Sequence, residues 1–492
     1  MARNPAVPLF LLLLTIYVFS AGGHLYSVDE LFYYSTTQAL AEKWSMNIAY
    51  AIPLFHQLGF LREVPENVSV YYSSYGPLHA ALAVPLYLVG AQLGVEPWRI
   101  VDLFYSPMVT AASAWLVYLI SRRLDASQRV AVLLSLLYGL ATVAWPYAKF
   151  FFDVTTASLM QLGAVYFLFD AKSQRRAVFL SGTFATLSIF ARITQVITLP
   201  GMLIYLVFKG SRRRARIVNI GTFMVPVAVG GALYAFLNLV RYDSPLYLGA
   251  NYSAVGNAIL SSQLSGSLLV GVYGLLFSAG EGLFLFYPLC AVGLIELLAP
   301  NRDHIWERFI FGWLFFSSLL FFGGLVIWYG WAAWGTRYLV TSVPYLVLAS
   351  LPLVKSIRVS ISRTIVAVSA ITVGVFSNLM GVLINFLYGF YYLVCMGGVG
   401  IAHPSCVGLQ CLEAPAEIWI PSFSPLRASW DLIWSQTFPM VWFPTAPDIF
   451  YLKARFDLYL YDRLGVWALA ITLILAFFEG VWLVRTISLE AD

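Results

Sequence analysis

Residues 217–240 read IVNIGTFMVPVAVGGALYAFLNLV, a run of 24 residues without one charged side chain. A helix that crosses the hydrocarbon core of a bilayer needs about 20 mostly apolar residues, so this run is long enough. Arg214 and Arg216 stand just before it and Arg241 directly follows it. The stretch therefore predicts a membrane-spanning α-helix.

The composition of the whole chain supports the same interpretation. Of 492 residues, 60% are apolar or aromatic and only 11% are Asp, Glu, Lys or Arg. Soluble domains carry about 25% charged residues, so too few charges remain here to cover a water-facing surface. This excludes a soluble enzyme, a disordered protein and a nucleic-acid binder. We expect an all-α polytopic membrane protein.

Apolar stretches of similar length recur along the chain and predict about twelve transmembrane helices. Two more apolar stretches, at 76–94 and 266–279, are interrupted by Gly or Pro, and we expect them to lie in the outer interface or re-enter the outer leaflet. The expected spans lie near 6–24, 100–121, 130–147, 154–171, 178–191, 195–208, 217–240, 282–299, 309–327, 338–354, 364–387 and 464–484.

The orientation follows from the basic residues, which stay on the cytoplasmic side. The short basic connections share one side if both termini are cytoplasmic, and with Arg3, Arg302, Arg308 and Arg485 they hold 18 of the 29 Lys and Arg residues. These connections contain Arg122-Arg123-Arg129, Lys172-Arg175-Arg176, Lys209-Arg212-Arg213-Arg214-Arg216 and Lys355-Arg358-Arg363. The outer side then holds a long first loop at about 25–99, which contains interfacial helices, a connection at 241–281 and a loop or cap at about 388–463. This predicts an integral protein of the plasma or inner membrane whose active site faces outward.

The ends of the chain leave two points open. The first apolar run, followed by Ser20-Ala21-Gly22, fits either an uncleaved first span, which we prefer, or a cleavable signal peptide. In the outer cap, Cys406 and Cys411 either pair or remain two unrelated thiols. We expect a catalytic membrane module over 1–350 and C-terminal helices with the cap over 351–492.

A few charged residues abut the expected spans on the outer side. Asp29 and Glu30 closely follow the first span, Asp153 and Arg192 lie in short outer turns, and Arg337 precedes a span. Charge at membrane depth is costly and is a functional hypothesis by default. A carboxylate there can take a proton from an acceptor hydroxyl, and arginines can hold a phosphate leaving group. The alternatives are charges that reach to water and, for Arg337, stacking among Trp328, Trp331 and Trp334.

Five stretches resemble the GT-C superfamily of membrane glycosyltransferases, in the branch of protein O-mannosyltransferases and aminoarabinose-lipid A transferases. The resemblance covers about residues 1–350. The sequence lacks the paired second acid and the WWD-type motif that oligosaccharyltransferases carry. The stretches are VDELFYYSTTQALAE (28–42), YYSSYGPLHAALAVPLYLVG (71–90), WPYAKFFFDVTTASL (145–159), GLLFSAGEGLFLFYP (274–288) and WGTRYLVTSVPYL (334–346).

The resemblance implies roles for individual residues. Asp29 matches the catalytic acid of the first loop and would be the general base, with Glu30 beside it and Asp153 at the second acidic position. The donor phosphate would contact Lys149, Arg192 and Arg337, and the cavity would be lined by Tyr75, His79 and Glu281. For His79 a structural hydrogen-bonding role, and for Glu281 a helix-capping role, are the alternatives.

The expected activity is that of a lipid-phosphate-sugar-dependent hexosyltransferase. It would move a sugar from a polyprenyl- or dolichyl-phosphate donor, with inversion, to a glycan, lipid or protein acceptor on the outer side of the membrane. No cofactor is certain, but Asp29 and Asp153 could hold Mg²⁺ or Mn²⁺. Membrane lipids are further expected partners. The alternative is a polytopic secondary transporter, although the sequence shows no two related halves.

Overall fold

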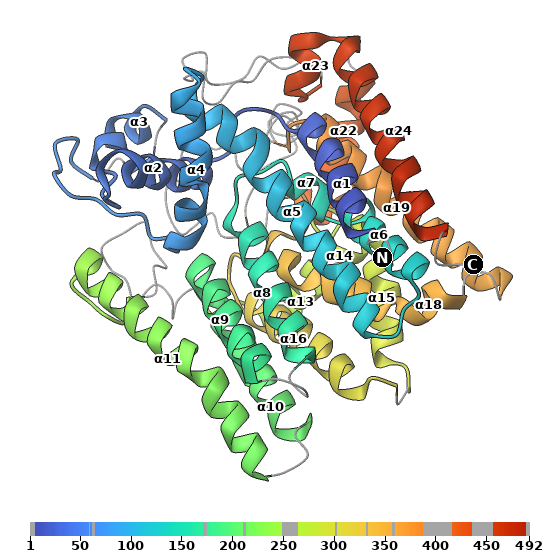
Figure 1. Ribbon diagram of the computed structural model, residues 1–492. Coiled ribbons are helices and arrows are strands. Elements are labelled where there is room, and N and C mark those ends of the chain that lie inside the picture. Colours follow the sequence, from blue (N-terminus) through green and yellow to red (C-terminus); the bar gives the residue numbers. More distant parts are fainter. Residues whose placement is uncertain are drawn as a thin grey trace.

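In the computed structural model of the protein, the described residues are 5–488 without 59, 62–63, 171–174, 210–212, 248–263, 301–302, 331–332, 357–359, 387–415 and 435–455. Over these residues the chain is almost entirely helical, with one isolated antiparallel bridge between Asn47 and Tyr72. Cys406 and Cys411, and most of the predicted cap, lie outside the described residues. The predicted all-α architecture is confirmed (Figure 1).

Five of the described helices are long and apolar enough to cross a membrane: α5 (Pro97–Arg123), α11 (Arg213–Tyr242), α16 (Ile305–Gly323), α19 (Ile361–Leu383) and α24 (Val466–Ser488). They establish an integral membrane protein. The other helices are α1 (Ala6–Ser20), α2 (Val28–Lys43), α3 (Ile52–Gln57), α4 (Pro77–Gln92), α6 (Gln128–Ala141), α7 (Ala144–Tyr147), α8 (Asp153–Phe169), α9 (Arg175–Ala191), α10 (Leu199–Lys209), α13 (Leu268–Phe277), α14 (Leu283–Phe286), α15 (Pro288–Leu298), α17 (Val343–Ala349), α18 (Leu351–Ser356), α21 (Ala416–Trp419), α22 (Pro425–Trp434) and α23 (Tyr459–Leu464).

Four short 3₁₀ helices complete the described elements: η1 (Ala49–Ala51), η2 (Ile193–Thr198), η3 (Arg337–Ser342) and η6 (Pro421–Phe423). They explain why several expected spans are shorter than the apolar stretch that predicted them. The span expected at 338–354 begins as η3 and then divides into α17 and α18, with Pro344 and Pro352 near the two starts. Proline lacks a backbone N–H and favours such helix starts. The count of twelve spans and the outer loop remain predictions.

Small residues let the helices of the bundle approach closely. Gly182 of α9 faces α11 so tightly that an added Cβ would lie 2.3 Å from the Phe223 carbonyl oxygen. Gly293 of α15 faces the Leu346 carbonyl of α17 in the same way, at 2.0 Å. Close backbone approach at small residues is the usual packing mode of membrane helices. It fixes α9, and with it the turn that follows at Arg192.

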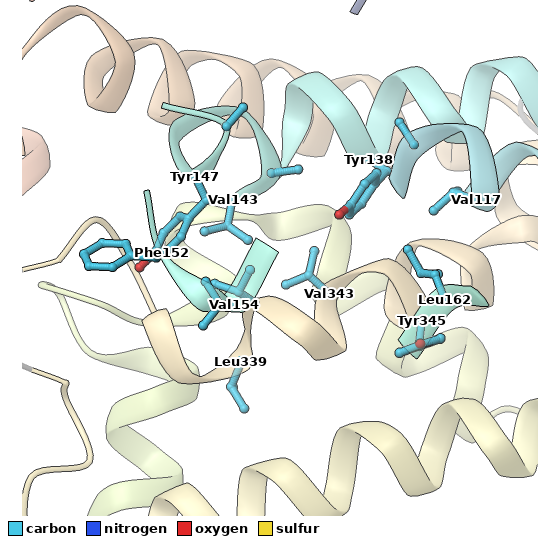
Figure 2. Packing of buried hydrophobic residues seen from close by; sticks show 14 of the residues in the cluster. Val117, Tyr138, Val143, Tyr147, Phe152, Val154, Leu162, Leu339, Val343 and Tyr345 are labelled. Carbon is cyan, nitrogen blue, oxygen red and sulfur yellow. The ribbon is translucent and has the colours of Figure 1, made fainter. Parts of the chain in front are cut away.

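The core between α5, α6, α8 and η3 surrounds the short turns that carry the predicted site. Tyr147, Phe152, Val154 and Leu339 are buried side by side in this core (Figure 2). Phe152 and Val154 are the sequence neighbours of Asp153. Because both flanking side chains are packed, the position of the Asp153 carboxylate is set by the core.

The two ends of the described chain pack against each other. Helix α1 contacts α24, and α2 packs on α4, which in turn packs on α5. Figure 1 shows α2, α3 and α4 together at one edge of the molecule. The division of the chain near residue 350 remains a prediction. The parts on either side of it are in contact, through α6 with α19 and through α1 with α24.

Candidate active site

Asp29 lies in the first turn of α2. The Ser27 side chain caps this helix by accepting the Glu30 N–H at 3.4 Å, and the helix N-terminus favours an acid in this turn. Asp29 is 7% exposed. The Tyr75 hydroxyl donates to Asp29 Oδ1 at 2.6 Å, and Arg337 Nη2 forms an ion pair with Asp29 Oδ2. The predicted base is therefore held by one phenol and one guanidinium.

Asp153 is the first residue of α8 and is 4% exposed. Its Oδ1 accepts a hydrogen bond from Arg192 Nη1 at 2.9 Å. Arg192 lies where α9 ends and η2 begins. Burial opposes the charge of this arginine, but the neighbouring Asp153 outweighs burial and raises the pKa of Arg192. The second predicted acid and the first predicted cation thus form a pair of their own.

The two ion pairs share one neighbourhood. The Tyr33 hydroxyl is within electrostatic range of Asp29 and Asp153 and of Arg192 and Arg337. Arg192 and Arg337 are also within electrostatic range of each other. Four residues that stand far apart in the sequence, on α2, α8, η2 and η3, therefore meet in one cluster.

Hydroxyl and guanidinium groups in this cluster have unused hydrogen-bonding capacity. Among the described residues, the buried Tyr33 and Tyr147 hydroxyls and Arg337 Nε have no hydrogen-bond partner. The Tyr33 ring lies 4.6 Å from that of Tyr75, which bonds Asp29. Buried polar atoms are nearly always paired, so unpaired donors around two acids favour a site for a polar ligand.

Glu30 is next to the base in sequence but faces another way. It is fully buried, and its Oε2 accepts the Tyr26 N–H at 2.5 Å. Burial, with a smaller contribution from Asp102 and Asp29, raises the pKa of Glu30 well above its usual value, against the backbone bond from Tyr26. A carboxyl that favours its protonated form holds the start of α2 better than it serves as a base.

His79 and Glu281 border the cluster. His79 Nδ1 lies 2.9 Å from Thr156 Oγ1, and its fully buried ring packs 4.8 Å from that of Tyr33. This geometry supports the structural role for His79. Glu281 is 2% exposed, its N–H donates to Ser278 Oγ at 3.2 Å, and its charge acts on Tyr147.

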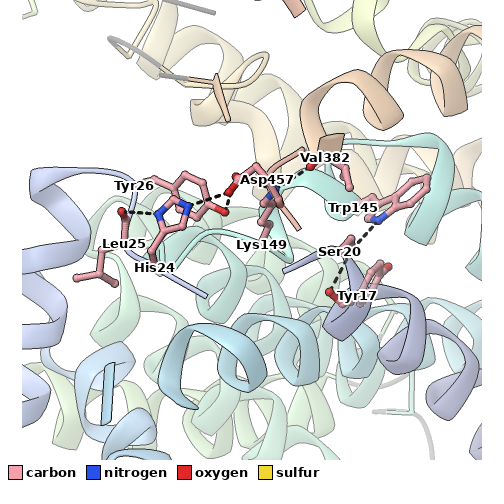
Figure 3. Close-up of polar contacts among 9 residues, drawn as sticks. All are labelled: Tyr17, Ser20, His24, Leu25, Tyr26, Trp145, Lys149, Val382 and Asp457. Atoms are coloured by element: carbon pink, nitrogen blue, oxygen red, sulfur yellow. Dashed lines mark hydrogen bonds and ion pairs between the residues drawn. The ribbon is translucent and has the colours of Figure 1, made fainter. Parts of the chain in front are cut away.

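Lys149 is part of a separate network with Asp457 (Figure 3). Its Nζ lies 2.8 Å from Asp457 Oδ2, donates to the Val382 carbonyl at 2.7 Å and also donates to the Asp457 carbonyl. His24 Nε2 lies 2.8 Å from Asp457 Oδ1, and the Tyr26 hydroxyl donates to Oδ2 at 2.8 Å. Burial opposes the Asp457 charge, but Lys149 and His24 lower the pKa of Asp457 below its usual range. Contact of Lys149 with a donor phosphate stays a prediction, and it competes with these bonds.

The residues fit a divalent cation only in part. Asp29 and Asp153 supply carboxylate oxygens of the kind that Mg²⁺ and Mn²⁺ prefer. Each of these acids is already neutralised by an arginine, and over the described residues no three His, Cys, Asp or Glu side chains converge. A cation at this position would have to displace a guanidinium.

Three residues of these networks were missed in the sequence. Tyr33 and Tyr338 stand beside predicted residues, in VDELFYY and directly after Arg337, and could have been included on that ground. Both lie within electrostatic range of Arg192 and Arg337. Asp457 gives no local signal, because its partners His24 and Lys149 are 433 and 308 residues away.

Comparisons with known proteins bear on the family and the fold of the chain. Residues 89–230 match the family model described as dolichyl-phosphate-mannose-protein mannosyltransferase. This segment contains Lys149, Asp153 and Arg192. No curated protein matches the sequence.

Among solved structures, the chain resembles the Archaeoglobus fulgidus oligosaccharyltransferase tethered with an acceptor peptide, with 13% identity and a TM-score of 0.51 over 77% of this chain and 55% of that chain. It also matches ArnT of Cupriavidus metallidurans bound to undecaprenyl phosphate, with 14% identity and a TM-score of 0.45 over 80% and 71% of the two chains. This chain thus spans about half the length of the oligosaccharyltransferase. The resemblance to the GT-C membrane glycosyltransferases is confirmed, by the fold and by the mannosyltransferase family model over residues 89–230.

Proposed function

We propose that the protein is a GT-C glycosyltransferase that moves a hexose from a polyprenyl- or dolichyl-phosphate donor to an acceptor hydroxyl or amide on the outer side of the membrane. The observation that carries the proposal is the meeting of two buried acid–arginine pairs, Asp29–Arg337 and Asp153–Arg192. The match of residues 89–230 to a dolichyl-phosphate-mannose-dependent family supports the donor class. Nothing in the fold or the family match favours the transporter alternative.

In the proposed reaction, the donor phosphate first competes with the acids for the two guanidinium groups. Arginine binds carboxylate and phosphate with the same planar donor geometry, so an incoming phosphate can replace a carboxylate as the partner of Arg337. This exchange frees Asp29 Oδ2 while the Tyr75 hydroxyl still holds Oδ1. The base is therefore released only when a donor is bound.

The chemical step is a direct displacement at the anomeric carbon. Asp29 accepts the proton of the acceptor group as its oxygen or nitrogen bonds to that carbon. The bond between the carbon and the phosphate oxygen breaks, and its electron pair stays on the lipid phosphate. Arg192 and Arg337 stabilise the charge that grows there. Attack opposite the leaving group inverts the anomeric centre.

The decisive assay measures sugar transfer from a polyprenyl-phosphate hexose by the protein in liposomes. We expect Asp29→Asn to lower transfer by about 10²–10⁴-fold, the usual contribution of a general base. The variant keeps the size of the side chain and the acceptor for Tyr75 but leaves Arg337 without its anion, so transfer is compared at equal amounts of folded protein, measured by thermal unfolding. Undiminished transfer by Asp29→Asn would remove Asp29 as the base.

The proposed orientation can be tested by cysteine labelling, after replacement of Cys395, Cys406 and Cys411 by serine. Glu66 and Arg213 are both exposed and lie on opposite sides in the proposed topology. Glu66→Cys should react with an impermeant maleimide added outside intact cells, and Arg213→Cys only after permeabilisation. The reverse pattern would put the active site on the cytoplasmic side.

Chelation tests the proposed cation site at Asp29 and Asp153. Transfer that is lost with EDTA and restored by Mg²⁺ or Mn²⁺ would place a cation in the reaction. Transfer that is unchanged by EDTA would mean that Arg192 and Arg337 stabilise the charge of the leaving phosphate without a cation.

A further inference from the structure

The first loop contains a polar hollow at the far end of α2. Its volume is about 400 Å³, within the range of small-molecule sites. Its lining includes the cation Lys43, the anion Glu66, the ring of Tyr50 and the short polar side chains of Ser45, Asn67 and Ser69, together with three apolar residues. We call this hollow the loop pocket.

Asn47 joins two irregular segments of the first loop beside the loop pocket. Its side-chain amide donates to the Ser69 carbonyl at 2.9 Å and accepts the N–H groups of Ala49 and Tyr71 at 3.0 Å. The Ile48 N–H donates to the Tyr71 carbonyl at 2.8 Å. These bonds hold together the two segments that line the pocket. The pocket is therefore formed in the absence of a ligand.

Trp44 lies between Lys43 and Ser45, which both line the loop pocket, and it has an unusual backbone conformation. It ends α2 with φ 50° and ψ 36°, the left-handed conformation that helix ends normally assign to Gly or Asn. Its side chain is 93% exposed. The exposed Trp44 ring is therefore attached to a strained backbone, and backbone strain of this kind is frequent at functional sites.

The chemistry of the pocket favours a sugar chain over other polymers. Sugar rings have an apolar face that stacks on aromatic rings and a rim of hydroxyls that both donate and accept hydrogen bonds. Tyr50 offers a ring in the lining and the exposed Trp44 a second ring next to it, and the hydroxyl and amide groups of Ser45, Asn67 and Ser69 offer both roles. Lys43 Nζ lies 5.0 Å from the centre of the Tyr50 ring, and Glu66 adds one opposite charge to the lining. With one positive and one negative side chain, the lining has no net charge that would attract a strongly charged polymer.

We propose that the loop pocket is a secondary binding site for a neutral oligosaccharide, which is the acceptor of the proposed transfer. This assignment rests on the proposed function, because Asp29 and Trp44 stand at opposite ends of α2, about 22 Å apart at 1.5 Å per residue. A chain of several sugar units, bound at the pocket by its far part, is long enough to cover this distance and bring its terminal hydroxyl to Asp29.

The test measures binding apart from transfer. The full-length protein in nanodiscs of phosphatidylcholine is titrated with maltohexaose, cellohexaose, α-1,6-mannohexaose and a neutral hexapeptide, and binding is followed by saturation-transfer NMR. We expect at least one oligosaccharide to bind, and Trp44→Ala to weaken it at least tenfold. Trp44→Gly, which suits the left-handed backbone, should weaken it equally and guards against a folding defect. Trp467→Ala, at a tryptophan exposed on α24, should bind as the wild type does.

Several results would overturn the proposal: no oligosaccharide binds, both Trp44 variants bind with unchanged affinity, or only the peptide binds. The proposal would also fail if brominated lipids quench the tryptophan fluorescence of the wild type more than that of Trp44→Ala, because this would place the Trp44 ring in the bilayer. Asp29→Asn separates the two proposals, since it should keep oligosaccharide binding while losing transfer. Binding without any transfer by the wild type would leave the loop pocket standing and reject the proposed enzyme.

Discussion

Two of the buried ionic networks among the described residues, around Lys149 and around Arg337, differ in how completely their groups are used. In the first, Lys149 donates to three acceptors, and both oxygens of Asp457 have partners. In the second, Arg337 bonds Asp29 and reaches the Gly330 carbonyl at 3.4 Å, while its Nε has no partner over the described residues. A lysine has three donors and an arginine five, so the first network is saturated and the second is not.

This difference separates a structural role from a functional one. A saturated network can bind nothing further without breaking, and the Lys149 network joins the end of α1, the turn before α8 and the segment before α23. The arginine pairs can exchange a carboxylate for a phosphate and keep hydrogen bonds in both states. We therefore expect changes in the first network to act on stability and changes in the second to act on transfer.

The largest expected effect is loss of stability in Lys149→Met. Removal of one partner leaves the Asp457 carboxylate buried without its cation, which typically costs about 3–5 kcal/mol. Thermal unfolding in detergent should show a clearly lowered midpoint. The double variant Lys149→Met/Asp457→Leu removes both charges and should recover much of the loss, since apolar replacement of a whole pair is often neutral. A single variant as stable as the wild type would contradict the structural role.

Arg337→Lys should leave stability nearly unchanged and lower transfer. Lysine keeps the positive charge beside Asp29 but loses the planar fork that holds phosphate. The loss of a hydrogen bond to a charged group is worth about 1.5–3 kcal/mol, or roughly ten- to a hundredfold in rate. Single-turnover transfer in liposomes measures the effect, with Arg463→Lys, outside the cluster, as the matched control. A destabilised Arg337→Lys variant with normal transfer would reverse the comparison.

A smaller and pH-dependent effect is expected for Glu30→Gln. Burial raises the pKa of Glu30 in the folded state, so its carboxyl contributes stability below the unfolded value of about 4.3, and this is lost as pH rises through the folded pKa. Glutamine can still accept the Tyr26 N–H without a charge. The variant should therefore melt at a higher temperature than the wild type near pH 8, and the gap should shrink towards pH 4.5. A constant gap would show that the Glu30 carboxyl has the same pKa in the folded and unfolded protein.

The sequence predicted the helical membrane architecture because uncharged runs such as 217–240 have one stable form in a bilayer. It also identified Asp29, Asp153, Arg192 and Arg337, since charges beside such runs are rare and therefore conspicuous. It did not reveal which acid pairs with which arginine, because Asp29 and Arg337 are 308 residues apart. Packing at Gly182 and around Phe152 decides that pairing, and these contacts leave no periodic signal along the chain.

The same limit explains Lys149. Its place in WPYAKFFFD resembles a phosphate-binding position, but its partner Asp457 comes from the far end of the chain. The loop pocket was missed for a different reason. Trp44 follows α2 as one aromatic residue among many, and only the left-handed backbone and the exposure of its ring set it apart.

Binding of polyprenyl phosphate tests the contrast between the two networks most directly. The lipid phosphate is the leaving group of the proposed reaction, and its dissociation constant can be measured in nanodiscs for Arg337→Gln and for the double variant Lys149→Met/Asp457→Leu. We predict that Arg337→Gln weakens binding by roughly ten- to a hundredfold, while the folded double variant binds as tightly as the wild type. Normal binding by Arg337→Gln together with loss of binding in the double variant would contradict the account and make Lys149 the phosphate contact.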